Sequence, residues 1–142
     1  MTHYYGSRSR HAPVSKISGL KKASLYLQIL LFGAAGINHF VHPAFYLRII
    51  PPYLPFHMAI NIVSGISEFV LSLLLVFQAT RKIAAYLIIV VLILFIPAHI
   101  YTLEINRCTA GKVCLPLVIA WLRLIPGQLL LIWWAFSVRS YK

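Results

Sequence analysis

The chain has 142 residues, of which 61% are hydrophobic, and its mean hydropathy is +0.84. Soluble globular domains are about half apolar, so this composition excludes an ordinary soluble fold. Thirteen Lys and Arg residues stand against two acidic ones, but most of the positive charge flanks apolar runs, which argues against nucleic acid as a partner.

Four apolar runs each approach the roughly 20 residues that cross a bilayer as a helix. They cover residues 23–40, 58–77, 83–103 and 115–138. An aqueous core could not bury four such helices in so short a chain. The sequence therefore predicts an all-α membrane protein, a four-transmembrane-helix bundle over residues 23–138, with a short interfacial aromatic and proline-rich segment between the first two helices.

The ends of the chain are polar and basic. Residues 1–22 contain no apolar stretch of the kind found in a signal peptide, so they are predicted to form a basic cytoplasmic tail. Four spans place both ends on one side, and nine of the thirteen basic residues fall on that side. The excess of Lys and Arg in cytoplasmic loops then predicts that both termini, including residues 139–142, are cytoplasmic.

The first apolar run ends in Asn38 and His39, and a segment rich in aromatic residues and proline follows. Residues 44–50 are predicted to form a short amphipathic helix at the membrane interface, anchored by Tyr46 and Arg48. Pro51 and the prolines after it should force an extended exit before the second span.

The second run carries an acidic residue, Glu68, in otherwise apolar surroundings. A lone carboxylate in such a run costs a few kcal/mol, about 3 in insertion experiments, unless it is paired, protonated or next to water. Asn61, Ser64, Glu68 and Ser72 follow one another at spacings of three, four and four, which puts them on one helix face. This polar face should point into the bundle.

Pro97 should kink the third helix just before its polar end.

A helix rises about 1.5 Å per residue, so polar residues of the other apolar runs lie at a depth in the membrane similar to that of Glu68. Arg123 is the expected charge partner of Glu68. The candidate ligand-binding residues are Asn38, His39, Glu68, His99, Tyr101, Arg123 and Gln128, with Glu68 as the candidate proton-carrying group. Two interpretations stay open: a polar network that fixes helix register, or a site for a polar head or a proton.

Other chemistry receives less support from the sequence. Cys108 and Cys114 fall in one loop and could form a structural disulfide, remain free thiols or act as a redox pair, although their spacing is not that of a C-x-x-C motif. His39 and His42 are three residues apart, but no compact ligand motif links them, so no metal site is predicted. A nucleophilic triad has no sequence signature here.

Several short motifs together resemble the DoxX-like family of small four-helix membrane proteins. They are Gly36-Ile37-Asn38-His39-Phe40, Pro43, Phe45-Tyr46, Pro51-Pro52-Tyr53-Leu54-Pro55, Ser64-Gly65 with Glu68, Pro97-Ala98 with Ile100-Tyr101, and Trp121-Leu122-Arg123 with Pro126 and Gln128. Two features depart from the family pattern. The basic tail is longer, and the stretch from Arg123 to Gln128 has one residue more than the common Arg-Leu-Pro-x-Gln.

The resemblance implies a four-helix bundle in the bacterial cytoplasmic membrane. Some members are linked to quinone-coupled sulfur oxidation, others to membrane complexes that handle oxidative stress, and distant eukaryotic relatives act as chaperones or cargo receptors. Three functions are therefore expected as alternatives. They are a redox-associated protein that binds a quinone or another amphipathic ligand, a non-catalytic accessory or chaperone subunit of a larger membrane complex, and a small transporter that works as a homodimer.

Overall fold

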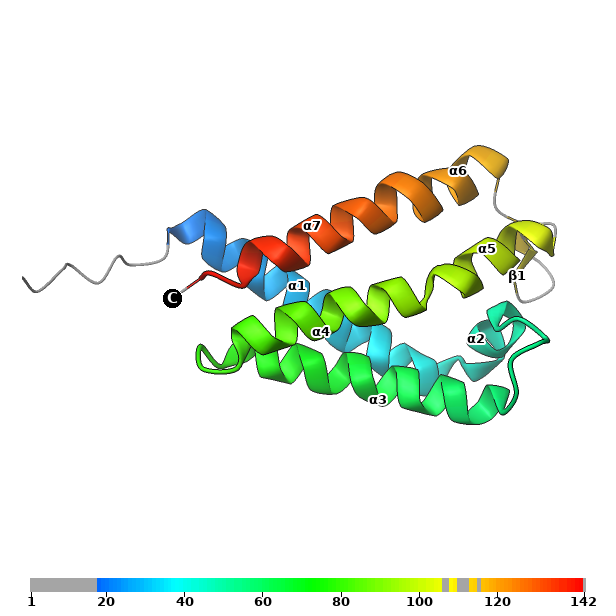
Figure 1. Cartoon of the computed structure of the whole chain (residues 1–142), viewed down its shortest axis with the longest axis horizontal. Coiled ribbons are helices and arrows are strands. Elements are labelled where there is room, and N and C mark those ends of the chain that lie inside the picture. Colours follow the sequence, from blue (N-terminus) through cyan, green and yellow to red (C-terminus); the bar gives the residue numbers. More distant parts are fainter. Residues whose placement is uncertain (1–17, 106–107, 110–112, 115, 142) are drawn as a thin grey trace, which may run out of the picture.

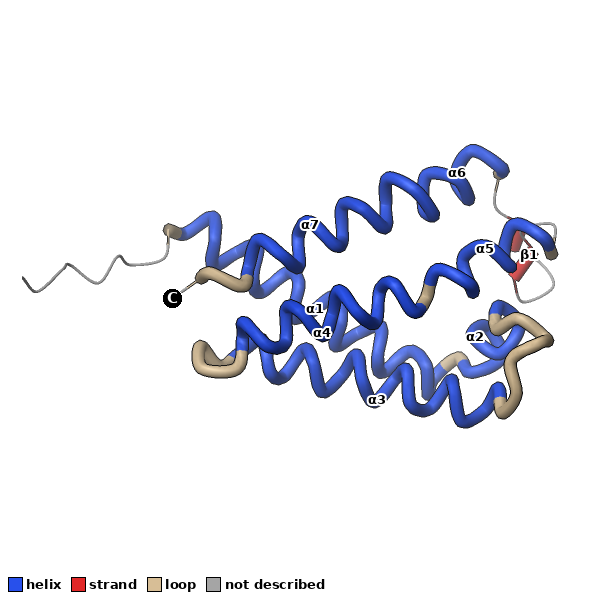
Figure 2. Tube along the Cα trace, viewed as in Figure 1, coloured by secondary structure: helices blue, strands red, loops and turns tan. Residues whose placement is uncertain are grey.

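The computed structural model describes residues 18–105, 108–109, 113–114 and 116–141. Helices account for nearly all of this part of the chain (Figure 1, Figure 2). They are α1 (Gly19–Val41), α2 (Pro43–Ile49), α3 (His57–Val76), α4 (Arg81–Leu94), α5 (Ile96–Glu104), α6 (Leu117–Leu122), the π-helix η1 (Arg123–Gly127) and α7 (Gln128–Val138). Two short strands, β1 (Cys108–Thr109) and β2 (Val113–Cys114), pair antiparallel.

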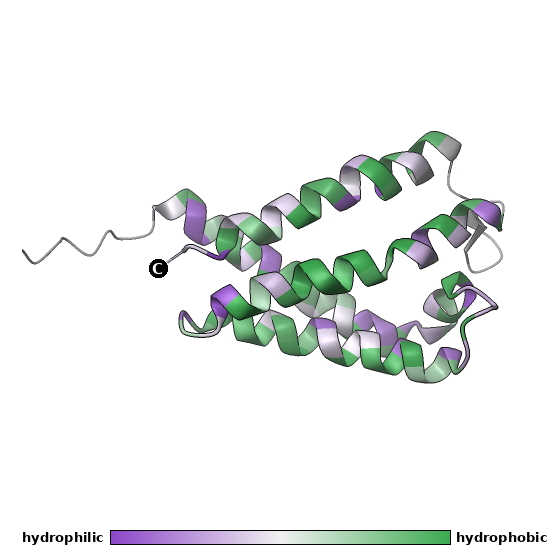
Figure 3. Ribbon diagram, in the orientation of Figure 1, coloured by the Kyte–Doolittle hydropathy of each residue, from purple (hydrophilic) through white to green (hydrophobic). Residues whose placement is uncertain are grey.

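Three helical segments are long and apolar enough to cross a membrane: Gly19–Val41, His57–Val76 and Arg81–Glu104. A shorter apolar helix, Arg123–Val138, corresponds to the last of the predicted runs. Hydrophobic residues cover most of α4 (Figure 3). The predicted all-α architecture is confirmed, and the length and composition of its helices fit several membrane spans.

The helix boundaries refine the predicted elements. The first helix begins at Gly19, so the last residues assigned to the basic tail belong to α1, whereas residues 1–17 lie outside the described part. The predicted interfacial helix exists as α2, which starts with a proline, a residue suited to the first helical position. The predicted kink at Pro97 corresponds to a one-residue break at Phe95 between α4 and α5, which otherwise form one 24-residue segment, Arg81–Glu104.

Both ends of the described chain lie at the same end of the bundle, beside the turn between α3 and α4 (Figure 1). Trp134 Nε1 donates to Ser24 Oγ at 2.8 Å, and the ammonium of Lys21 lies 5.7 Å from the centre of the Tyr141 ring. We call this the basic end, because it carries Lys21, Lys22, Arg81, Lys82 and Arg139. The opposite end holds α2, and we call it the α2 end.

At the basic end, Arg81 is buried and satisfies backbone carbonyls that the end of α3 leaves without helical partners. Its guanidinium donates to Leu75 O at 3.0 Å, to Val76 O at 3.1 Å and to Tyr141 O at 2.8 Å. Thr80 Oγ1 adds a bond to Leu74 O at 2.6 Å. One side chain thus links the α3–α4 turn to the last described residue.

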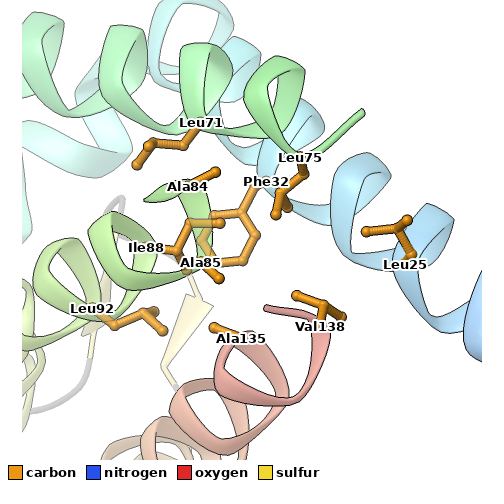
Figure 4. Packing of buried hydrophobic residues seen from close by; sticks show 10 residues of the cluster. All are labelled: Leu25, Phe32, Leu71, Leu75, Ala84, Ala85, Ile88, Leu92, Ala135 and Val138. Atoms are coloured by element: carbon orange, nitrogen blue, oxygen red, sulfur yellow. The ribbon is translucent and has the colours of Figure 1, made fainter. Parts of the chain in front are cut away.

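The half of the bundle nearer the basic end has an apolar core contributed by α1, α3, α4 and α7 (Figure 4). Its buried members are Leu25, Phe32, Leu71, Leu75, Ala84, Ala85, Ile88, Leu92, Ala135 and Val138. Because lipid tails are as apolar as leucine, such helices associate through close packing rather than through the hydrophobic effect.

The closest packing joins α1 and α3. A Cβ added at Gly36 would lie 2.7 Å from Gly65 O, and one added at Gly65 would lie 2.7 Å from His39 Cβ. No side chain larger than hydrogen fits at either position without a shift. The two glycines therefore set the distance at which α3 holds its polar face against α1.

Candidate functional site

A cavity of about 490 Å³ occupies the half of the bundle nearer the α2 end. All the major helices contribute to its wall. The polar lining residues are His39, Tyr46, Asn61, Ser64, Glu68, His99, Arg123 and Gln128. The remaining wall is apolar, with contributions such as Phe32, Ile49 and Phe95. The volume lies within the range of about 300–1,000 Å³ that small-molecule sites occupy.

Glu68 belongs to a buried group of polar side chains that come from α1 and α3. Its side chain is 7% exposed, and its Oε2 lies 3.5 Å from His39 Nε2. Asn61 holds the other side of the imidazole, because Asn61 Oδ1 is 2.9 Å from His39 Nδ1. The amide nitrogen of Asn61 donates to the backbone carbonyl of His39 at 3.1 Å.

These bonds determine where protons sit. Only the amide NH₂ of Asn61 can donate to the carbonyl of His39, so the amide oxygen faces Nδ1 and Nδ1 must carry a hydrogen. In a neutral imidazole, Nε2 is then a bare acceptor that faces Glu68 Oε2. Two acceptors attract each other only with a proton between them. Such a proton is present only if Glu68 is protonated or His39 is an imidazolium, and at 3.5 Å Oε2 has no hydrogen-bond partner among the described residues.

Tyr46 of the interfacial helix covers His39. The two rings are stacked, with centroids 3.6 Å apart and an interplanar angle of 21°. Asn38 Nδ2 donates to the Tyr46 hydroxyl at 2.9 Å. Burial raises the pKa of the Tyr46 phenol, so the hydroxyl stays neutral and keeps a proton that it can donate on the cavity wall.

The last helix reaches the cavity through η1. Arg123 and Gln128 both line the space, although they are five residues apart. In a regular α-helix five residues correspond to about 500° of rotation, which would leave the two side chains on different faces. The wider turn of the π-helix, which pairs residue i with i+5, brings them to one side. Gln128 Nε2 also donates to Leu92 O at 2.6 Å, in the last turn of α4.

The structure brings together five of the seven predicted ligand-binding residues: His39, Glu68, His99, Arg123 and Gln128 line one cavity. Asn38 and Tyr101 do not line it, although Asn38 reaches it indirectly through its bond to Tyr46. Among the described residues, the basic side chain within 4 Å of the Glu68 carboxyl is the imidazole of His39 and not the guanidinium of Arg123.

The predicted ligand-binding set lacks three polar residues of the cavity wall, Tyr46, Asn61 and Ser64. Asn61 stands on the polar face of α3, so that pattern was sufficient to include it. Tyr46 was interpreted only as an interface anchor, and its stacking on His39 depends on the fold of α2 back over α1.

The cysteine prediction remains untested. The backbone ladder places Cys108 opposite Cys114, but their side chains lie outside the described part of the structure. Within the described residues, no group of three His, Cys, Asp or Glu side chains is close enough to hold a metal ion.

Comparison with known proteins gives one match. No curated protein and no solved structure matches the chain, and the DoxX-like family is not found. One family model covers residues 27–139, which include every residue that lines the cavity. The chain therefore belongs to the family DUF8561, a domain of unknown function.

Proposed function

We propose that this chain is a redox-associated membrane protein with four spans, which binds a quinone or another amphipathic ligand in the cavity around Glu68. The observation that carries the proposal is a buried carboxyl at the wall of a 490 Å³ cavity. Its Oε2 has no hydrogen-bond partner among the described residues, although His39 lies 3.5 Å away. Buried polar atoms are rarely left without a partner, so this atom favours a ligand site over a closed structural network.

The residues present fit a quinone head. Such a head is flat and apolar and carries two carbonyl oxygens that accept hydrogen bonds. A protonated Glu68 would donate such a bond from its unpartnered oxygen, and Arg123 supplies permanent donors on the same wall. Phe32, Ile49 and Phe95 supply apolar surface for the ring. When bound, a quinone would provide the redox chemistry; the protein would bind it, orient it and hold a proton at Glu68.

The arrangement also supports the predicted topology. In this proposal, the segment Leu117–Val138 forms the fourth span, because α6, η1 and α7 follow one another without interruption. The basic end then lies in the cytoplasm, together with both termini. The cavity consequently opens toward the outer leaflet of a bacterial cytoplasmic membrane. We also propose that the chain shares ancestry with the DoxX-like proteins that its motifs resemble.

The accessory-subunit alternative loses part of its motivation. Its motivation is the small size of the chain, the lack of catalytic motifs, and helix faces rich in Gly and Ala that could pack against another protein. In the structure Gly36 packs against Gly65 of α3, and Gly33 lies beside Ser72, so both glycines make contacts within this chain. The accessory subunit stays a hypothesis, and co-purification with a larger membrane complex would support it. The third function, a small transporter, requires a homodimer, so a strictly monomeric state in lipid would argue against it.

The two acidic residues of the chain provide a matched test. Glu68 lines the cavity, whereas Glu104 is exposed at the end of α5 and does not. We expect the purified protein in lipid nanodiscs to bind a chain-free benzoquinone, measured by calorimetry. Glu68→Leu should weaken binding about fivefold, since a hydrogen bond from a neutral carboxyl to a quinone carbonyl contributes about 0.5–1.5 kcal/mol. Glu104→Leu should bind like the parent protein. Absence of binding, or equal binding by both variants, contradicts the proposal.

A further inference from the structure

A second hollow, a groove of about 520 Å³, lies on the outside of the bundle between α3 and the α4–α5 break. Its wall contains two hydroxyl-bearing residues and is otherwise apolar. The lining residues are Pro55, Phe56, Ala59, Ile60, Val63, Ser64, Ser67, Val91, Leu94 and Phe95. No charged side chain lines it, in contrast to the polar cavity, which holds Glu68 and Arg123.

The groove and the polar cavity share part of one wall. Ile60, Ser64, Leu94 and Phe95 line both spaces. Two of these residues come from α3, and Leu94 and Phe95 stand at the point where α4 ends and α5 begins. At this point Pro97 cannot supply the backbone N–H that a continuous helix would require. The helix break therefore lies between the polar cavity and the lipid-facing groove.

The mouth of the groove is shaped by an unusual backbone. Phe56 has φ 58° and ψ 46°, the left-handed conformation that a bulky residue rarely adopts. It is the residue before α3, and its ring is largely exposed. Phe56 lines the groove, so a residue with strained backbone borders this space, and strained backbone clusters at ligand-binding and other functional sites.

We infer that the groove holds the hydrocarbon chain of the same ligand whose polar head occupies the cavity, and that the ligand enters from the bilayer between α3 and the α4–α5 break. This inference rests on the proposed function and narrows it to ligands with a carbonyl-bearing head and an apolar chain. The head meets the Glu68 side of the shared wall, and the chain passes Ile60 and Phe95 to lie along Val63 and Val91.

Two valines of α3 allow a matched test. Val63 lines the groove and is 61% exposed, whereas Val70 is 44% exposed and lines neither space. Val63→Trp should fill the groove without disturbing the core, and Val70→Trp places the same bulk on another part of the helix. The probes are one benzoquinone head without a chain and the same head with a ten-carbon chain ending in a diazirine. A ten-carbon alcohol carrying the same diazirine serves as the headless probe.

In the parent protein and Val70→Trp, irradiation of the headed probe should label residues 55–67 or 91–95, mapped by mass spectrometry. The chain-free head should compete for this labelling. Val63→Trp should weaken binding of the chain-bearing head about fivefold, a modest effect because chain and lipid are equally apolar and only packing is lost. It should leave binding of the chain-free head unchanged.

The outcomes separate the inference from the proposed function. If the chain-free head binds but Val63→Trp leaves the chain-bearing head unaffected, the groove inference is wrong and the proposed function stands. Equal labelling by the headless probe, without competition from the head, would show that ordinary lipid fills the groove, which also overturns the inference. If neither head binds, the proposed function fails.

Discussion

Asn61 makes two hydrogen bonds to His39, one with the imidazole Nδ1 at 2.9 Å and one with the backbone carbonyl at 3.1 Å. The second bond crosses from α3 to α1 at the level of the Gly65 contact. Asn61 therefore connects the packing of two helices to the orientation of one ring. That orientation presents Nε2 to Glu68.

Asn61→Ala should destabilise the protein and loosen the site together. Interhelical hydrogen bonds in membranes contribute about 0.6 kcal/mol each on average, so the loss of two should cost about 1 kcal/mol. The imidazole would also lose the bond that fixes its protonated nitrogen, so quinone affinity should fall. Thermal unfolding in detergent and calorimetric binding measure the two effects. Ile62→Ala, at an exposed neighbouring position, is the control and should change neither.

The glycines of α1 and α3 give a graded prediction. Gly36→Ala and Gly65→Ala should each cost about 1–3 kcal/mol, the usual effect of overpacking, because the new methyl group would lie 2.7 Å from existing atoms. Gly33→Ala should cost less, since its nearest neighbour is the Ser72 hydroxyl at 3.2 Å.

Gly19→Ala is the control for this series, because nothing lies within 4 Å of the added methyl group. Unfolding free energies measured in one detergent should rank the four variants in that order. Equal stability of Gly36→Ala and Gly19→Ala would show that α1 and α3 are not packed as described.

Arg81→Leu should destabilise the basic end. The guanidinium binds three backbone carbonyls from a buried position, and a buried acceptor that loses its partner costs about 1–3 kcal/mol. Lys82→Leu removes the same charge from an exposed neighbouring position and should have little effect. The melting temperature and the rate at which carboxypeptidase removes the C-terminus should both separate the two variants. Equal behaviour would mean that the charge, rather than the carbonyl bonds, matters.

Much of the architecture could be predicted from the sequence, because it depends on local patterns. The spacing of Asn61, Ser64 and Glu68 identified the inward face of α3, and Pro97 located the break in the third span. The stacking of Tyr46 on His39 could not be predicted, since it depends on where α2 folds back. The contact of Glu68 with His39 could not be predicted either, because charge alone favoured Arg123 as the partner.

One irregularity in the sequence has a structural explanation. The stretch from Arg123 to Gln128 is one residue longer than the pattern it resembles, and the structure places a π-helix over Arg123–Gly127. A π turn holds one residue more than an α turn. The extra residue is thereby absorbed locally, and Arg123 and Gln128 still line the same cavity.

Deletion of Ile125 should therefore be tolerated. It restores the spacing Arg-Leu-Pro-x-Gln, and residues four apart share a face of an α-helix, so both polar side chains should still reach the cavity. Ile125 is exposed, so no core contact is lost.

Deletion of Leu129, which is also exposed, is the control. It falls within regular α7 and would rotate Ala135 and Val138 by about 100° relative to Gln128. We expect parental quinone affinity and melting temperature for the Ile125 deletion and loss of both for the Leu129 deletion; the reverse order would mean that the π turn is not what aligns Arg123 with Gln128.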